Sequence, residues 1–118
     1  MANILIVDDS RIIRRVLTNT LKEAGHEIAG EAANGEEALK ILETVTPDLV
    51  TLDITMPVMD GLETLNRIKE SYPDLKVIMI SAAGQKNKVL QALKDGALDF
   101  IRKPFEKDEM LEVISKHL

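Results

Sequence analysis

The sequence predicts an α/β domain of five successive strand–helix units, in which a parallel sheet carries helices on both faces. Short apolar runs alternate with segments of helical periodicity along all 118 residues. Three of the runs are continuous and rich in β-branched residues, as in strands that are buried on both faces. The connections are short, so successive strands must be joined by right-handed crossovers through the helices.

The five predicted strands differ in how apolar they are. The first, third and fourth, at residues 4–7, 49–52 and 77–80, are unbroken apolar runs. The second and fifth, at residues 27–30 and 100–101, are more polar or shorter. An edge strand has only one neighbour and stays partly exposed, so we expect these two at the edges of the sheet.

Each predicted helix has apolar residues every three or four positions, which form one buried face. Gly25 suits the end of the first helix, Pro47 and Pro73 cannot continue the second and third, and the fourth stops near Gly96. The apolar positions are Ile13, Val16, Leu17, Leu21 and Ala24 in the first helix, Ala38, Leu39, Ile41, Leu42 and Val45 in the second, Leu62, Leu65, Ile68 and Tyr72 in the third, Val89, Ala92 and Leu93 in the fourth, and Met110, Leu111 and Ile114 in the fifth.

Composition narrows the class of protein. Hydrophobic residues make up 45% and charged residues 30%, as expected for one globular domain spanning residues 1–118. The net charge of -5 argues against nucleic acid as the main partner. The chain has no cysteine, which excludes disulfides and thiolate chemistry and fits a reducing cytoplasm. It shows neither a signal peptide nor the ~20-residue apolar run of a membrane span.

Polar residues follow the predicted strands where each one ends. Asp8 and Asp9 close the first strand, Asp53 the third, Ser81 the fourth and Lys103 the fifth. Singly, each has a plainer explanation as a helix cap, a loop hydroxyl or a solvated charge. Together, however, they meet at one edge of a parallel sheet, where ligands of such folds bind.

Their chemistry fits phosphoryl transfer. Three clustered carboxylates repel one another, and a hard divalent cation such as Mg²⁺ together with the ammonium group of Lys103 would offset that repulsion. A carboxylate oxygen of Asp53 can attack phosphorus to form an acyl phosphate. Lys103 and Mg²⁺ would neutralise the transferred group, and Ser81 would donate a hydrogen bond to one of its oxygens.

These residues, in order and with their spacing, resemble the receiver domains of response regulators in two-component systems. The matching segments are ILIVDDS at 4–10, DITMP at 53–57 with MDG at 59–61, SA at 81–82 and KPF at 103–105. The resemblance implies a flavodoxin-like (CheY-like) fold with strand order 2-1-3-4-5. It also implies a signalling domain rather than an enzyme, phosphorylated on Asp53 by the phosphohistidine of a sensor histidine kinase.

The resemblance assigns further roles. Asp9, Asp53 and the backbone carbonyl of Thr55 would bind Mg²⁺ directly, and Asp8 would assist through water. The peptide bond before Pro104 would be cis.

The same resemblance implies a switch pair. Ser81 and Phe100 would form it, in place of the threonine and tyrosine of many members. Output would pass through the fourth helix, fifth strand and fifth helix, around Val89, Phe100 and Lys107.

The segments 53–57 and SAAGQ at 81–85 are similar to stand-alone chemotaxis receivers of the CheY class. Such a protein would be a cytoplasmic monomer that passes between a CheA-like kinase and a target such as the flagellar motor switch.

One alternative is a receiver cut from a longer regulator with a DNA-binding output domain. An aspartyl-phosphate phosphatase is another, although that class usually has a second Asp where this chain has Thr55. An electron carrier with bound FMN is a third, but the loop after the first strand is acidic and only 3% of residues are aromatic.

Overall fold

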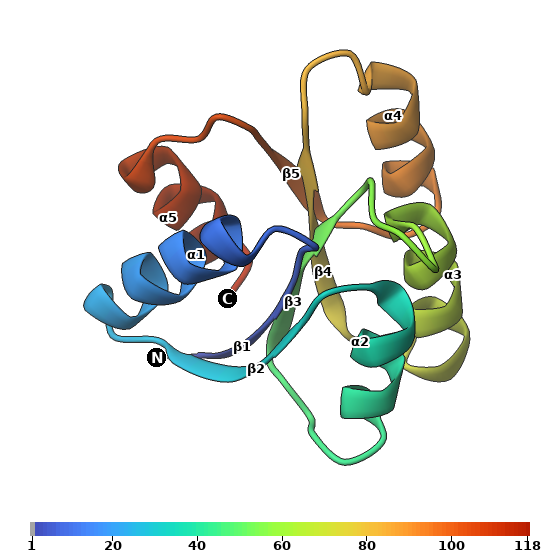
Figure 1. The fold of residues 1–118 in the computed structure, drawn as a ribbon, viewed down its shortest axis with the longest axis horizontal. Coiled ribbons are helices and arrows are strands. Elements are labelled where there is room, and N and C mark those ends of the chain that lie inside the picture. Colours follow the sequence, from blue (N-terminus) through green and yellow to red (C-terminus); the bar gives the residue numbers. More distant parts are fainter. Residues whose placement is uncertain (1) are drawn as a thin grey trace.

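The structure, a computed structural model, describes residues 2–118 and confirms the five strand–helix units (Figure 1). Each predicted strand is present, and each is followed by a helix. The elements are β1 (Asn3–Val7), α1 (Arg11–Glu23), β2 (Glu27–Ala32), α2 (Gly35–Leu42), β3 (Leu49–Asp53), α3 (Gly61–Ser71), β4 (Lys76–Ser81), α4 (Lys86–Lys94), β5 (Asp99–Arg102) and α5 (Lys107–Lys116).

The sheet is parallel, with strand order β2-β1-β3-β4-β5, as the family resemblance implied. β2 and β5 are the edge strands, which confirms the expectation from their polarity. β1, β3 and β4 are almost wholly buried. Because β1 and β3 are neighbours, the residues that follow them leave the same edge of the sheet side by side.

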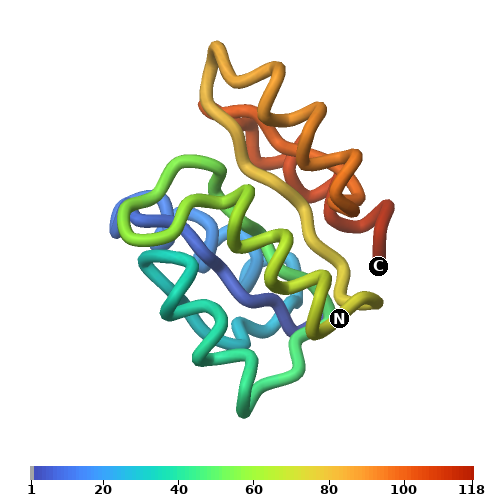
Figure 2. The backbone as a smooth tube through the Cα atoms, turned by 90° about the vertical axis from the view of Figure 1, so that its right-hand side faces the viewer, coloured from blue at the N-terminus to red at the C-terminus, as the bar shows by residue number. Residues whose placement is uncertain are grey.

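The helices form two layers, one on each face of the sheet. α1 and α5 cover one face, and α2, α3 and α4 lie side by side on the other (Figures 1 and 2). Alternate residues of the strands point into separate cores. Leu5, Val50 and Met79 pack toward α2, α3 and α4, whereas Ile6, Ile78 and Ile80 pack toward α1 and α5. Within residues 2–118 no helix combines the length and apolarity needed to span a membrane.

Several details differ from the helical pattern expected from the sequence. Ala24 at the end of α1 and Leu93 in α4 are exposed, although their spacing placed them on buried faces. Val16 is 42% exposed, although its spacing placed it on the buried face of α1. The adjacent Leu17 and Leu21 are fully buried, and successive residues on a helix are rotated by about 100°, so Val16 falls at the margin. In addition α2 ends at Leu42, three residues before Val45, where the chain turns toward Pro47.

Gly61 brings the start of α3 against the end of β3. Its backbone N–H donates to the carbonyl oxygen of Ile54 at 2.7 Å. A Cβ added at Gly61 would overlap the carbonyl oxygen of Asp53 and would lie 2.7 Å from the Cα of Ile54. Both neighbours are backbone atoms and cannot swing away, so only glycine permits this approach. The packing of α3 is thereby tied to the position of Asp53.

We expect Gly61→Ala to lower the free energy of unfolding by about 1–3 kcal/mol, because the loop after Asp53 must shift to admit a methyl group. Gly30→Ala is the matched control, since a Cβ there would meet its nearest atom, Leu5 Cδ1, at an ordinary 3.5 Å. Urea denaturation of the three proteins measures the difference. Equal stabilities of the two variants would show that the close approach at Gly61 does not constrain the loop.

Candidate functional site

Asp8 and Asp9 lie in the short connection between β1 and α1, and they differ in exposure. Asp8 is fully buried and Asp9 is exposed. The backbone N–H of Asp8 donates to Ala32 O at 3.0 Å, which extends the pairing of β1 with β2. Ser10, rather than either aspartate, caps α1 by accepting a hydrogen bond from the N–H of Ile13 at 3.2 Å. Helix capping therefore does not explain the acidic pair.

Asp53 is the last residue of β3 and is only 5% exposed. Strand pairing carries it to the end of β1, where it meets Asp8 and Asp9. Ligand oxygens of the three carboxylates all lie within 4.8 Å of one another. The structure thus gathers the three acidic residues that the sequence placed at the strand ends.

Lys103 supplies the positive charge at this cluster. Its Nζ lies 3.0 Å from Asp8 Oδ2 and 3.5 Å from Asp53 Oδ1. Its backbone N–H donates to Ser81 O at 2.6 Å, which joins the end of β5 to the end of β4. The Lys103–Pro104 peptide bond is cis, in agreement with what the family resemblance implied.

Burial and crowding make Asp53 hard to ionise. Burial raises its pKa, the charges of Asp8 and Asp9 raise it further, and Lys103 opposes the increase. The net result is a pKa of about 6, compared with an ordinary value of 3.8. One ammonium group does not compensate for three carboxylates at this distance.

The cluster fits a hard divalent cation. Its donor atoms are all oxygens, which Mg²⁺ prefers. Within the described residues, the buried Asp8 Oδ2 accepts no hydrogen bond, although its distance of 3.0 Å from Lys103 Nζ makes it part of an ion pair. This oxygen therefore keeps acceptor capacity for a cation or for a water bound to one.

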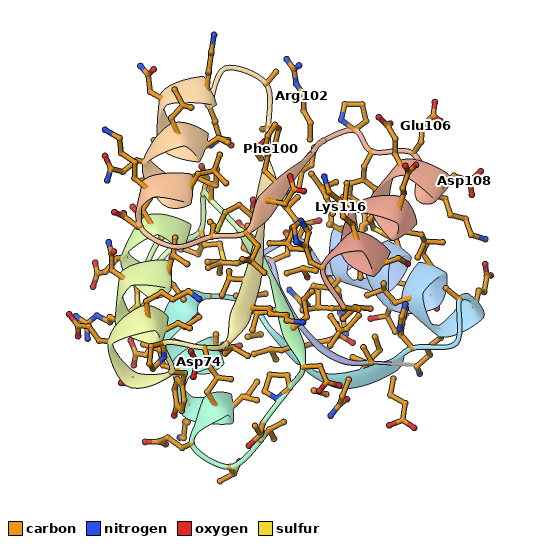
Figure 3. All side chains as sticks on the ribbon, turned by 180° about the vertical axis from the view of Figure 1, so that it is seen from behind. Asp74, Phe100, Arg102, Glu106, Asp108 and Lys116 are labelled. Atoms are coloured by element: carbon orange, nitrogen blue, oxygen red, sulfur yellow. The ribbon has the colours of Figure 1, made fainter. Side chains whose placement is uncertain are left out.

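Ser81 and Phe100, from the neighbouring strands β4 and β5, line one cavity. Ser81, at the end of β4, is 3% exposed, whereas the ring of Phe100 on β5 is 41% exposed. Both line a cavity of about 290 Å³ that extends to Val89 and Leu93 of α4. Figure 3 shows Phe100 and Arg102 together on β5, at the opposite end of the molecule from Asp74. The buried hydroxyl and the exposed ring thus share one space.

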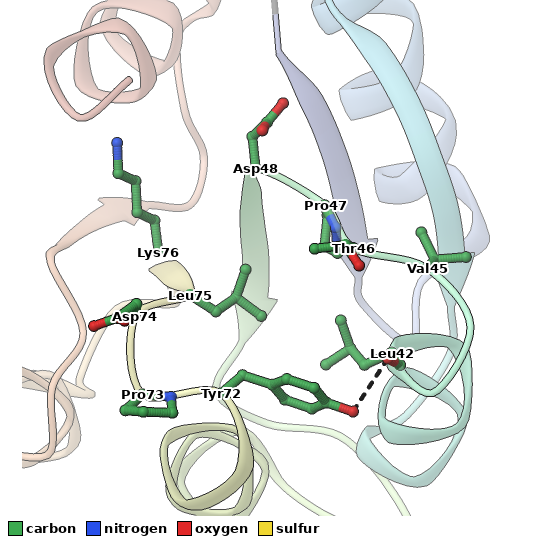
Figure 4. Close-up of a pocket in the computed structure, with 10 residues that line it drawn as sticks. All are labelled: Leu42, Val45, Thr46, Pro47, Asp48, Tyr72, Pro73, Asp74, Leu75 and Lys76. Carbon is green, nitrogen blue, oxygen red and sulfur yellow. Dashed lines mark hydrogen bonds between the residues drawn. The ribbon is translucent and has the colours of Figure 1, made fainter.

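A second cavity, of about 380 Å³, lies at the amino ends of β3 and β4, at the end of the sheet away from Asp53. It is enclosed by the chain between α2 and β3 and by the chain between α3 and β4. The hydroxyl of Tyr72 donates to Leu42 O at 3.1 Å within it (Figure 4). Its walls are mainly apolar and hold no carboxylate cluster. The carboxylate cluster thus lies at the Asp53 end of the sheet and not in this cavity.

Two residues that support the site were not expected from the sequence. Arg14 donates from Nη1 to Asp8 O at 2.8 Å and is paired with Glu31 at 3.2 Å, so it holds the loop that carries Asp8. Gln85 contacts the loops after β3 and β4. Helical periodicity shows only that Arg14 lies off the apolar face, and no local pattern signals a contact between residues 30 positions apart in the chain.

In metal-free protein we expect the carboxyl of Asp53 to titrate near pH 6, and Asp8→Asn to lower that pKa by removing a neighbouring charge. The folded pKa lies above the unfolded value, so the native state binds more protons between about pH 4 and 6. Stability should therefore rise as pH falls through this range, by up to about 3 kcal/mol. ¹³C NMR of the side-chain carboxyls with EDTA present measures the pKa.

Asp74→Asn is the control, because Asp74 is exposed and precedes β4, whereas the cluster follows the carboxyl ends of β1 and β3. It should leave the Asp53 titration unchanged. A pKa for Asp53 near 4 in the unmodified protein would contradict the crowding that the structure shows.

Comparisons with known proteins place these features in one family. The family described as "Response regulator receiver domain" matches residues 4–115. The chain is 51% identical over 116 residues to chemotaxis protein CheY of Listeria monocytogenes, covering 98% of both chains, and 46% identical to that of Bacillus subtilis, covering 98% of this chain and 96% of the relative. It is also 47% identical to a protein-glutamate methylesterase/protein-glutamine glutaminase of Bacillus subtilis, but it spans only 30% of that protein and the match takes in 88% of this chain.

Solved structures of receiver domains have the same fold as this chain. The receiver domain of NtrX from Brucella abortus superimposes with a TM-score of 0.94 at 38% identity, covering 98% of both chains. The Borrelia burgdorferi complex described as CheX-CheY-BeF3-Mg+2 matches with a TM-score of 0.87 at 41% identity, covering 98% of this chain and 89% of that chain. The longer NtrX structure from Brucella abortus matches with a TM-score of 0.94 at 39% identity over 99% of this chain, which spans only 27% of that protein.

Proposed function

The chain belongs to the response regulator receiver family, and from this premise we propose that Asp53 is the residue that accepts the phosphoryl group, in a magnesium-dependent reaction. One observation carries the proposal. The ligand oxygens of Asp53, Asp8 and Asp9 lie within 4.8 Å of one another, and Lys103 Nζ is within 3.5 Å of Asp53. This is the arrangement that a carboxylate nucleophile for phosphorus requires.

The reaction follows from these positions. A carboxylate oxygen of Asp53 attacks the phosphorus of a phosphohistidine, a P–O bond forms, and the P–N bond to the imidazole breaks. With a pKa of about 6, Asp53 is mainly ionised at neutral pH and can act as the nucleophile. Lys103 neutralises charge on the transferred oxygens, and the Ser81 hydroxyl donates to one of them.

Mg²⁺, held directly by Asp9, Asp53 and the Thr55 carbonyl and through water by Asp8, would supply the positive charge that Lys103 alone cannot provide. The buried Asp8 Oδ2, which is paired with Lys103 but accepts no hydrogen bond, supports this assignment. Asp9 is exposed, so its carboxylate can give up bound water and coordinate a metal ion without any change in the core.

Ser81 and Phe100 form the proposed switch. When the hydroxyl of Ser81 turns toward a phosphoryl group, the packing of their shared cavity changes and the ring of Phe100 moves inward. The half-exposed position of Phe100 beside about 290 Å³ of free space supports this motion. The surface of α4, β5 and α5 around Val89, Phe100 and Lys107 would then bind a partner differently.

We place the domain, as residues 1–118, in a chemotaxis pathway. Its partners would be a CheA-like sensor histidine kinase and a target such as a flagellar motor switch protein. The names of relatives that match over nearly their whole length support this role, and the absence of cysteine suits a reducing cytoplasm. A receiver unit within a longer regulator is the second candidate, because the chain matches just 27% of NtrX and 30% of a methylesterase.

Asp53→Asn should abolish labelling by acetyl phosphate in Mg²⁺, because the neutral amide is a poor nucleophile for phosphorus. The fold should persist, since the two side chains have the same shape. Intact-protein mass spectrometry measures the added phosphoryl group, and Asp48→Asn, at the opposite end of β3, is the matched control. Labelling of the Asp53→Asn variant at the normal level would assign the reaction to another residue.

Lys103→Met should retain Mg²⁺ binding, because the carboxylates remain and a competing cation is lost. However, binding of a phosphoryl mimic at Asp53 should no longer change the conformation of the output surface. NMR titrations with Mg²⁺ and then BeF₃⁻ test both parts, with shifts at Val89 and Phe100 as the readout. Lys40→Met, on the exposed side of α2, controls for the loss of one charge. Normal shifts at the output surface in Lys103→Met would remove Lys103 from the coupling.

A further inference from the structure

Gln85 joins the two loops that border the Asp53 pocket. Its Nε2 donates to Thr55 Oγ1 at 2.5 Å, and its Oε1 accepts from the backbone N–H of Ala82 at 2.7 Å. Thr55 lies two residues after Asp53, and Ala82 directly follows Ser81. A single side chain therefore connects the loop after β3 to the loop after β4.

The local backbone favours this contact over the usual one. Gln85 is the N-cap residue of α4, yet its side chain makes no capping hydrogen bond. The N-cap side chains of α1, α2 and α3 cap their helices, whereas Glu106 of α5, like Gln85, makes no such bond. Gly84, with φ of +82°, turns the chain just before α4, a conformation that residues with a Cβ rarely adopt. The Gln85 amide therefore serves the loops instead of the helix.

A phosphoryl group on Asp53 would compete with this arrangement. It adds three acceptor oxygens in the space between the two loops. The N–H of Ala82 is the backbone donor next to Ser81. Because it already donates to Gln85, it cannot donate to a phosphoryl oxygen at the same time. While Gln85 accepts from this N–H and donates to the Thr55 hydroxyl, the two loops are joined and the Ala82 N–H is not available to a phosphoryl oxygen.

We propose that Gln85 is a positioning residue whose two hydrogen bonds stabilise the unphosphorylated arrangement of these loops and thereby oppose phosphoryl capture. This inference rests on the proposed role of Asp53. Gln85 also lines the cavity shared by Ser81 and Phe100, so its release is transmitted to the same space that the switch pair repacks. The free energy needed to break the contact is part of the difference between the two states.

Gln85→Ala should bind BeF₃⁻ about 3- to 10-fold more tightly than the unmodified protein in saturating Mg²⁺, the ratio expected for losing one or two side-chain hydrogen bonds. Thr55→Val removes one of the two bonds and should produce a smaller increase. The double variant should match Gln85→Ala, because both substitutions act on the same contact. NMR titration measures the affinities.

Gln91→Ala is the matched control, because Gln91 is on the same helix but donates only to Asp95 Oδ1 within α4, at 3.0 Å. It should leave the affinity unchanged. In BeF₃⁻-free Gln85→Ala, the Ala82 amide resonance should move toward its position in the BeF₃⁻-bound unmodified protein. A merely structural role would lower the melting temperature without either effect.

The two possible failures can be told apart. If the unmodified protein binds BeF₃⁻ and Gln85→Ala binds it equally or more weakly, Gln85 does not oppose capture and the inference is wrong. If the unmodified protein itself fails to bind BeF₃⁻ with Mg²⁺ present, the proposed function of Asp53 is contradicted instead.

Discussion

The enforced proximity of three carboxylates is the constraint on which the rest of this structure depends. Buried carboxylates normally pair with cations or lose their charge. Here Asp8 and Asp53 are both buried and Lys103 is the cation in contact with them. The site is therefore strained in its metal-free, ionised state. A bound cation would offset this excess negative charge and so allow an anionic phosphoryl group to approach Asp53.

The scaffold keeps the centre of the site rigid and its rim compliant. Asp53 terminates a central strand that is buried on both faces, and Arg14 holds the backbone of Asp8. Gly61 places the start of α3 against the backbone of Asp53, so this backbone cannot shift away from β1 without moving α3. The loops after β3 and β4 are instead linked by side-chain hydrogen bonds of Gln85, which exchange for bonds to water or to a ligand at a small net cost in free energy. The rigid centre thus suits chemistry, and the compliant rim suits signalling.

The sequence by itself determined the architecture and the membership of the acidic site. Apolar runs that alternate with helical periodicity imposed five parallel strands, and the parallel arrangement brought Asp8, Asp9, Asp53 and Lys103 to one edge. Such patterns are local, and the hydrophobic effect enforces them wherever they occur. These patterns did not predict the exposure of Val16 or the end of α2 at Leu42. Periodicity does not specify where neighbouring elements stop covering a helix.

Only the tertiary structure decided how the site is supported. The positions of Arg14 under Asp8, Gly61 against Asp53 and Gln85 between two loops depend on contacts between residues distant in the chain. No local signal encodes those contacts, since arginine, glycine and glutamine suit many other environments. The elevated pKa of Asp53 belongs to the same class, because it arises from distances between charges and from burial, which exist only after the chain has folded.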